Sequence, residues 1–275
     1  MKLRNRLLLV GFGVVVFLIV TPALIMFARG FKFDLQSWQL IKTGTLVVRT
    51  EPEHATVFID DKPQKNLTPL TIRFLLPGDY VIRIEKEGYS SWTKRLSIKS
   101  QLATWANANR EFITLFLKQP QPETQAEVPK NEAFPISEGL IQAGQLSFTL
   151  QDSILFRQNP GLEKIYEPVR EAYWDDESKR IVLSNNNEIL LLDPLNDSPD
   201  LILRSVSEIR NARLNWHTGY MFFQNEGRIK AIELDGRDHR NVYTITDAGV
   251  DFTIDEKGER LYVMGQTEVK EYRIR

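Results

Sequence analysis

The chain has 275 residues, enough for one large domain or two modest ones. Lysine and arginine (35) balance aspartate and glutamate (36), so no overall positive charge favours nucleic acid, and we expect no nucleic-acid partner. Cysteine is absent, which excludes disulfides, thiolate nucleophiles and cysteine-ligated zinc.

The N-terminal segment has the composition of a membrane helix. Residues 7–28 contain no charge and would span about 33 Å as a helix, the thickness of a bilayer's hydrocarbon core. A cleaved signal peptide is the alternative, but its apolar region is normally shorter and ends in small residues. Cations at Lys2, Arg4 and Arg6 outnumber Arg29 and Lys32 beyond the helix. We therefore expect a single-pass membrane protein with residues 1–6 in the cytoplasm and the bulk of the chain outside it.

A short juxtamembrane segment, residues 29–43, mixes aromatic and polar side chains. Phe31, Phe33 and Trp38 could lie near lipid headgroups, where amphipathic rings are favoured, or pack against the next domain. The sequence leaves both possibilities open.

From residue 44 to 118 the apolar pattern alternates with a period of two. Short β-branched segments are separated by turn signals rich in proline, glycine and aspartate, with no helical segment between them. The spacing places Leu46 and Val48 on one face of a strand, and likewise Val57 and Ile59. About six strands in this length predict a small β-sandwich. Residues 119–135, which include four prolines and little to bury, predict an extended and exposed linker.

Residues 136–275 contain an internal repeat with a period near 40. Residues 172–193, 213–235 and 250–274 share one plan of strand, polar turn, strand, short hairpin and strand, and a looser unit precedes them. Such a repeat is typical of propeller blades. Three to four blades make either an unusually small ring or an open stack with an exposed edge. The predicted fold class is all-β behind one N-terminal transmembrane helix, with a sandwich followed by a partial propeller.

The sandwich segment resembles the PEGA domain, named for its Pro-Glu-Gly-Ala motif. The residues that carry the resemblance are Pro52, Glu53, Ala55, the strand 57–61, Thr68, Pro69, Pro77, Gly78, Gly88 and Tyr89. His54 stands where that motif has glycine, which suggests a turn with positive φ that histidine adopts only at a cost. The resemblance implies a cell-envelope β-sandwich of bacteria without catalytic residues.

The repeats look like WD40-like or TolB-type propeller blades, which have a polar turn such as residues 175–180 before a strand. This second resemblance implies a binding platform, again without catalytic residues to transfer.

No combination of residues predicts an active site, a metal site or a cofactor. His54 is the only histidine of the sandwich, and neither residues 174–178 nor residues 193–200 have the spacing of a calcium loop. We expect the hairpin at residues 185–188 to have no functional role. Three aromatic residues, Tyr89, Trp92 and Trp105, are candidates to face a sugar ligand, although at strand spacing they more often pack in a core.

These observations favour a non-catalytic envelope protein that binds or scaffolds a protein or glycan. Two alternatives stay open. One is an envelope-polymer hydrolase, or an enzyme subunit, that would gather carboxylates on one rim of the propeller. The other is a sensor or assembly partner that completes its open blade stack with another chain.

Overall fold

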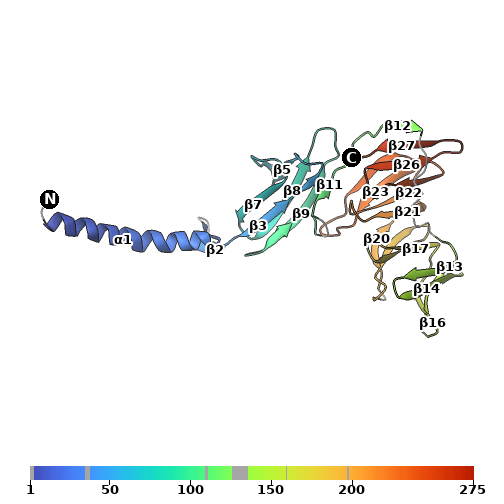
Figure 1. Ribbon diagram of the computed structural model, residues 1–275, viewed down its shortest axis with the longest axis horizontal. Helices are drawn as coiled ribbons and strands as arrows, with labels where there is room; N and C mark the ends of the chain where they lie inside the picture. Colours follow the sequence, from blue (N-terminus) through green and yellow to red (C-terminus); the bar gives the residue numbers. More distant parts are fainter. Residues whose placement is uncertain (1–2, 35–37, 109–110, 126–135, 159, 197) are drawn as a thin grey trace.

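The computed structural model describes residues 3–34, 38–108, 111–125, 136–158, 160–196 and 198–275. One helix is followed by a β-sandwich and then by four four-stranded sheets, so the protein is mostly β as the sequence predicts. The helix, the sandwich and the blades follow one another along the long axis of the molecule (Figure 1).

Helix α1 (Leu3–Ala28) continues through Pro22. Its segment Val10–Ala28 has a mean hydropathy of 2.6, lies fully exposed, and is long and apolar enough to cross a membrane. A hairpin of β1 (Phe31–Asp34) and β2 (Gln39–Lys42) follows. The helix meets the sandwich through the stacked rings of Phe27 and Phe74, whose centroids are 4.9 Å apart.

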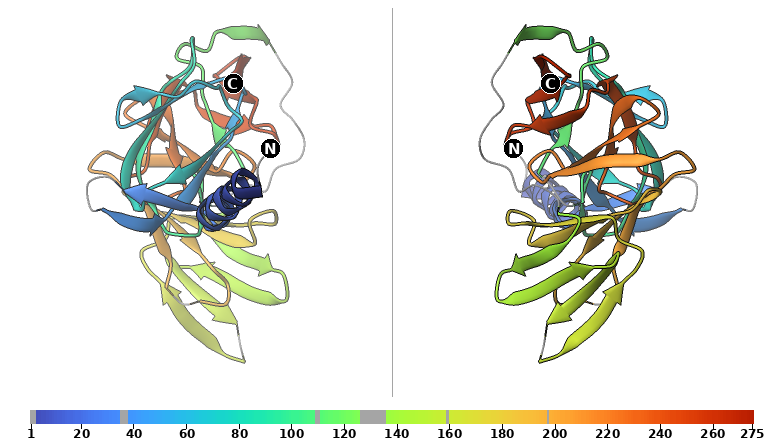
Figure 2. Two further views of the ribbon diagram at one scale, coloured as in Figure 1. Left: turned by 90° about the vertical axis from the view of Figure 1, so that its left-hand side faces the viewer. Right: turned by 90° about the vertical axis from the view of Figure 1, so that its right-hand side faces the viewer.

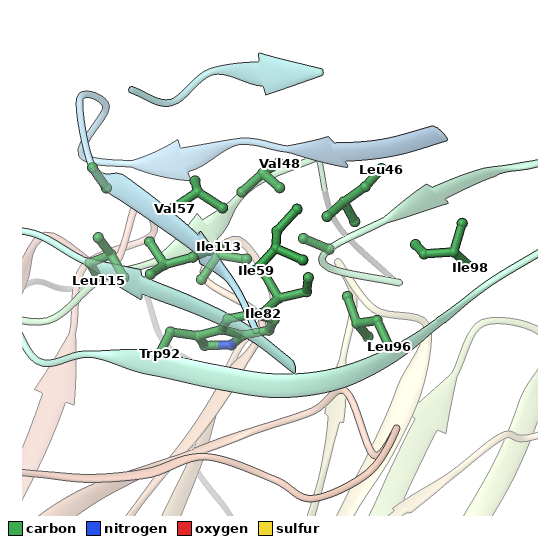
Figure 3. Packing of buried hydrophobic residues seen from close by; sticks show 13 residues of the cluster. Leu46, Val48, Val57, Ile59, Ile82, Trp92, Leu96, Ile98, Ile113 and Leu115 are labelled. Carbon is green, nitrogen blue, oxygen red and sulfur yellow. The ribbon is translucent and has the colours of Figure 1, made fainter. Parts of the chain in front are cut away.

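The sandwich packs a three-stranded sheet, in the order β10-β3-β7, against a four-stranded sheet, in the order β6-β5-β8-β9. Alternate residues point inward, so Leu46, Val48, Val57 and Ile59 are buried in one core, as their spacing predicts (Figure 3). The strands are β3 (Gly44–Val48), β4 (Thr50–Glu51), β5 (Thr56–Ile59), β6 (Lys62–Pro63), β7 (Leu70–Leu75), β8 (Gly78–Glu85), β9 (Trp92–Ile98), β10 (Ala103–Trp105) and β11 (Ile113–Thr114).

The repeats form four blades, each a sheet of four antiparallel strands. Blade 1 holds β13 (Gly139–Ala143), β14 (Leu146–Gln151), β15 (Ile154–Gln158) and β16 (Leu162–Tyr166). Blade 2 holds β17 (Glu171–Asp175), β18 (Arg180–Ser184), β19 (Glu188–Leu192) and β20 (Asp200–Arg204). Blade 3 holds β21 (Ile209–Asn215), β22 (Tyr220–Asn225), β23 (Arg228–Glu233) and β24 (Val242–Asp247). Blade 4 holds β25 (Asp251–Ile254), β26 (Arg260–Met264), β27 (Val269–Arg273) and β12 (Pro122–Gln125).

Strand β12 comes from the segment predicted to be a linker. Within it, residues 122–125 pair with β27 as the outermost strand of blade 4, because their extended backbone supplies the edge that β27 leaves unpaired. These four residues are extended, as the sequence predicts, but they serve as a strand of blade 4 and not as a linker. The remainder of the predicted linker, residues 126–135, lies outside the described residues.

The repeat includes the turn between the first and second strands of a blade. In blades 2, 3 and 4 the first turn begins with Asp175, Asn215 and Asp255, each 40 residues from the next. Each side chain accepts a hydrogen bond from a backbone N–H of its own turn, with donor–acceptor distances of 2.7 to 2.9 Å. These two aspartates and one asparagine thus shape turns, as short polar side chains commonly do.

The blades form an open row. One buried apolar cluster joins blades 1 and 2, another joins blades 2 and 3, and a third joins blades 3 and 4. Among the described residues no such cluster joins blade 4 to blade 1, and these blades stand at opposite ends of the row in both figures (Figure 1 and Figure 2). The sequence allows a small closed ring or an open stack of blades, and the described residues form the open stack.

Candidate binding site on the blades

The position of any site on the blades depends on how the sandwich meets them. The contact is made by β9 and the end of blade 3, where the Glu233 carboxylate accepts hydrogen bonds from three side chains and from the Asn241 backbone N–H. Trp92 Nε1 and Lys94 Nζ each lie 2.9 Å from it, and Asn241 Nδ2 lies 2.8 Å from it. Both Lys94 and Glu233 are almost wholly buried. A buried charge pair is tolerated here because every polar atom of the carboxylate has a partner.

A second set of contacts surrounds this pair. Arg237 donates to the Asp235 carboxylate and to the backbone carbonyls of Trp105 and Ala106 in the sandwich. Burial tends to raise the pKa of Asp235, but the hydrogen bonds from Arg237 and the charge of Lys94 lower it overall. Asp235 is therefore ionised at neutral pH and completes the buried network.

An aromatic cluster closes the junction on its apolar side. Phe116 packs its ring against Tyr220 and Tyr243 of blade 3, with centroid distances of 4.9 and 5.7 Å. Burial raises the pKa of both tyrosines, so both stay neutral, and the Tyr243 hydroxyl donates to the carbonyl of Ser91. The sandwich and blade 3 thus share one continuous buried interface.

This interface fixes which end of the blades is covered. The blade 3 residues that bond the sandwich lie in or near its first turn, residues 216–219, and its third connection, residues 234–241, with Tyr243 near the start of β24. We name this end of the blades the junction rim. The opposite end, the distal rim, is formed by the turns 152–153, 185–187 and 226–227 and the connections 167–170, 205–208 and 248–250.

The distal rim carries a groove across blades 1 to 3. One cavity of about 840 Å³ lies between blades 1 and 2, and another of about 540 Å³ lies on blade 3 between the connections 205–208 and 248–250. The connection 205–208 borders both, so the two form one surface. Their volumes fall in the range of roughly 300–1,000 Å³ found for ligand sites.

Two asparagines hold that connection from either side. Asn187 donates to the carbonyls of Ser205 and Val206, and Asn225 donates to the carbonyls of Ser207 and Glu208. Because its backbone carbonyls are satisfied, the loop keeps one shape while the Val206 side chain is fully exposed at its tip. The groove is therefore preorganised around an exposed apolar residue.

Charged side chains line the groove in pairs. Arg204 bonds Glu188, Arg210 bonds Glu208, and Lys230 bonds Glu226. A hydrogen bond from its basic partner is the main cause that lowers the pKa of each of these three carboxyls. They are ionised at neutral pH, which suits binding and does not suit a general acid, whose pKa must be raised.

The PEGA-motif residues form a structural turn. Thr68 is buried, its Oγ1 accepts from the Ala55 N–H at 2.9 Å, and its carbonyl accepts from the His54 N–H at 2.9 Å. His54 has φ of 64° and is exposed, so it keeps the left-handed turn that glycine would favour. Of the remaining motif residues, Pro52, Glu53, Pro69, Pro77 and Gly88 lie in turns or bends of the sandwich, Gly78 begins β8, and Tyr89 forms a β-bridge with Leu117.

The three candidate aromatic residues have different surroundings. Trp92 is fully buried, with its ring in the sandwich core and its N–H on Glu233, so the expectation that it could face a ligand was wrong (Figure 3). Tyr89 is half-buried against the same core. Trp105 is 39% exposed and lines a cleft beside the junction.

The groove and the junction were both missed in the sequence. The run of three asparagines at residues 185–187 was interpreted only as a hairpin, yet Asn187 is one of the two side chains that shape the groove. Lys94 sits at an inward-facing position of β9, and this charge at an apolar position was the one available signal for the junction. Within the described residues no three acidic or histidine side chains gather as a metal site.

Comparisons with known proteins identify part of the chain. Residues 43–111 match the PEGA domain, which confirms the resemblance of the sandwich. No curated protein matches the sequence. The blades give no match to a WD40 family.

Solved structures share the β-propeller-like arrangement at low similarity. A protein from Bacteroides uniformis described as a 6-phosphogluconolactonase is 11% identical, with 88% of this chain and 86% of that chain covered and a TM-score of 0.37. The periplasmic gluconolactonase of Pseudomonas aeruginosa is 8% identical, with coverage of 88% and 86% and a TM-score of 0.37. The extracellular domain of a one-component system from B. thetaiotaomicron is 10% identical, with coverage of 89% and 31% and a TM-score of 0.38. Similarity at this level transfers no function. In sum, the chain joins a PEGA domain to a row of propeller-like blades behind one apolar helix.

Proposed function

We propose that the protein is a non-catalytic binding or scaffolding protein of the cell envelope, anchored by its N-terminal helix. The observation that carries the proposal is the position of the groove. The sandwich occupies the junction rim of blade 3, so the groove on the distal rim faces away from the sandwich and from the helix that precedes it. A partner can therefore reach the groove while the chain stays attached to a membrane.

The anchor rests on three features. The helix is apolar and exposed over Val10–Ala28, more cations precede it than follow it, and PEGA domains are typically extracellular. A signal sequence would pass the same test of length and composition. The proposal that the helix remains as a single-pass anchor, with the N-terminus inside, therefore needs its own experiment.

That experiment is protease treatment of intact cells that carry the chain with a tag on each end. We expect loss of the C-terminal tag from spheroplasts, protection of the N-terminal tag, and membrane association that survives high salt and alkaline carbonate. A soluble protein with both tags protected from the protease would contradict the anchor. A soluble product that lacks the N-terminal tag would show that the helix is cleaved off as a signal peptide.

The groove is tested separately by site-specific photocrosslinking. A photoreactive residue at Val206, on the distal rim, should give a defined adduct in cells, and Arg204→Glu or Arg210→Glu should abolish it by reversing a charge beside the loop. The matched control is Glu177, an equally accessible turn residue on the opposite rim of blade 2. Equal adducts at both positions would contradict a specific site.

Two other functions compete with this one. The hydrolase hypothesis requires carboxylates on one rim, and Glu188, Glu208 and Glu226 do lie along the distal rim. Each is held ionised by a basic partner, so none of the three suits the role of the general acid in such a hydrolysis. Loss of a measured hydrolytic activity in Glu188→Gln would favour the enzyme instead.

The open row of blades favours assembly as a second candidate. Blade 1 ends the row with exposed Leu140 and Leu162, which a further chain could cover. Light scattering of the detergent-solubilised chain distinguishes the two: a stable dimer that Leu140→Lys dissociates supports assembly, and a monomer at all concentrations argues against it.

A further inference from the structure

A second cleft lies on the side of the junction, between the sandwich and blade 3. Its volume is about 630 Å³, and it is lined by the outward face of β9, by β10 and by the blade 3 residues Arg237 and Asp238. The cleft exists because the buried Lys94–Glu233 pair holds the two parts together. It is distinct from the groove on the distal rim, with which it shares no lining residue.

The charge of this cleft is positive. Arg95 and Lys99 are exposed, and within the described residues neither side chain forms an ion pair. Arg237 adds a third cation, although its guanidinium is engaged by Asp235. The one carboxylate of the lining, Asp238, accepts the Arg95 backbone N–H at 2.9 Å and lies beside His239. Asp238 therefore offsets part of the charge of Arg95, and the cations of the lining still outnumber its one carboxylate.

The opposite wall combines an aromatic ring with apolar and hydroxyl groups. Trp105 is 39% exposed, and the Arg49 guanidinium lies 5.4 Å from its ring centroid. Leu102 is more than half exposed, and the Thr104 hydroxyl donates to the Ser97 carbonyl of β9 at 3.4 Å. An indole ring offers a negative face to the weakly positive C–H groups of a sugar ring.

From this combination we propose that the junction cleft binds an anionic saccharide, a chain of sugars that carry carboxylate or phosphate groups. Trp105 contacts the C–H face of one sugar, while Arg95 and Lys99 pair with its acidic groups through charge-assisted hydrogen bonds. The inference rests on the proposed function for one premise, that the sandwich and blades lie outside the cytoplasm, where such polymers occur. It adds the chemical class of a ligand and a site other than the groove.

The test measures binding of trigalacturonate by calorimetry, with the full chain in phosphatidylcholine nanodiscs at low ionic strength. We expect saturable binding, at least roughly tenfold weaker binding of neutral galactotriose, and a weakening with added salt. Arg95→Gln and Lys99→Gln should each weaken binding about tenfold, the size expected for a hydrogen bond to a charged group. Trp105→Ala should weaken the binding of both saccharides, while Trp105→Phe, which keeps a ring, should retain most of the affinity.

Control probes and variants decide among other occupants. Triglutamate and a short single-stranded oligonucleotide carry similar charge, and equal binding of either would overturn the proposal in favour of a peptide or nucleic-acid site. Absence of saturable trigalacturonate binding, or binding that Arg95→Gln and Lys99→Gln leave unchanged, would also overturn it. Arg204→Gln on the distal rim should leave this affinity unchanged. A failure here would therefore leave the crosslinking result at Val206 standing, and failure of that crosslink would not remove saccharide binding at the cleft.

Discussion

The two joints of this molecule, helix to sandwich and sandwich to blades, are built in opposite ways. At the first joint one stacked pair, Phe27 and Phe74, and the bonds of Thr43 to the Gly30 backbone connect the helix end to the sandwich. At the second joint a buried lysine, a buried glutamate and an aromatic cluster join strands that are far apart in the sequence. Figure 1 shows the narrow first joint beside the broad second one.

The difference between the two joints shows which contacts fix the orientation of one part of the molecule relative to the next. Apolar surfaces can slide against one another with little change in energy, whereas a buried ion pair is satisfied in only one arrangement. We infer that Lys94 and Glu233 fix the angle at which the blades leave the sandwich, while the helix joint leaves the outer region free to tilt over a membrane. Variants at each joint test this difference in rigidity.

The largest effect should come from Lys94→Ala. It leaves the Glu233 carboxylate buried without its cation, which costs about 3–5 kcal/mol of folding free energy. Urea unfolding of the full chain in detergent measures the loss. In Lys94→Met/Glu233→Gln neither charge remains, so the double variant should lose less than the two single variants added together. Strict additivity would show that the pair is not coupled.

Acid should weaken the junction next. The pKa of Asp235 is lower in the folded protein than its ordinary value, so its contribution is complete above the unfolded pKa of about 4 and is lost as the pH falls through the folded pKa. The Phe27–Phe74 contact contains no titratable group and should not respond. We expect the urea midpoint to fall below about pH 4, and less steeply in Asp235→Asn. An unchanged slope in that variant would contradict the role of Asp235.

Phe74→Ala should have a smaller effect, about 1 kcal/mol or less. The stacked pair contributes only modestly beyond the area it buries, and Phe74 has φ of 62°, a conformation that costs energy for a bulky side chain. Spin labels on the helix and on the sandwich should report a broader distance distribution in this variant. Labels placed across the junction, on the sandwich and on blade 3, should report the wild-type distribution and serve as the control.

His54 provides a reference position away from both joints. His54→Gly should change stability by less than about 1 kcal/mol, since relief of the left-handed strain is offset by the greater freedom of glycine in the unfolded chain. His54→Val should destabilise by about 1–2 kcal/mol because a branched side chain fits this φ poorly. Thermal midpoints distinguish them, and a more stable valine variant would contradict the turn geometry.

The fold could be predicted well because it depends on short-range patterns. The alternation at Leu46 and Val48 gives strand and face together, and the repeat of residues 172–193, 213–235 and 250–274 at a period near 40 identifies the blades. The sequence could not decide whether His54 has a positive φ, since a residue type does not fix φ.

The sites could not be predicted because they join residues far apart in the sequence. Glu233 lies 141 residues from Trp92, and neither residue alone indicates the other. The groove is formed by loops of three blades whose individual sequences look like ordinary turns. Of the three candidate aromatic residues predicted from the sequence, Trp105 lines a cleft.

The position of β12 has a consequence for the order of folding. Blade 4 needs β12, which precedes the other three blades in the chain, and β27, which follows them. During synthesis β12 is made long before its partner, so it waits unpaired while blades 1 to 3 form. Pairing of these distant strands closes a long loop, which is entropically costly and slow. Blade 4 should therefore be the last part of the protein whose backbone amides become protected from hydrogen exchange. Until it forms, a shortened or stalled chain is most exposed to chaperones and proteases.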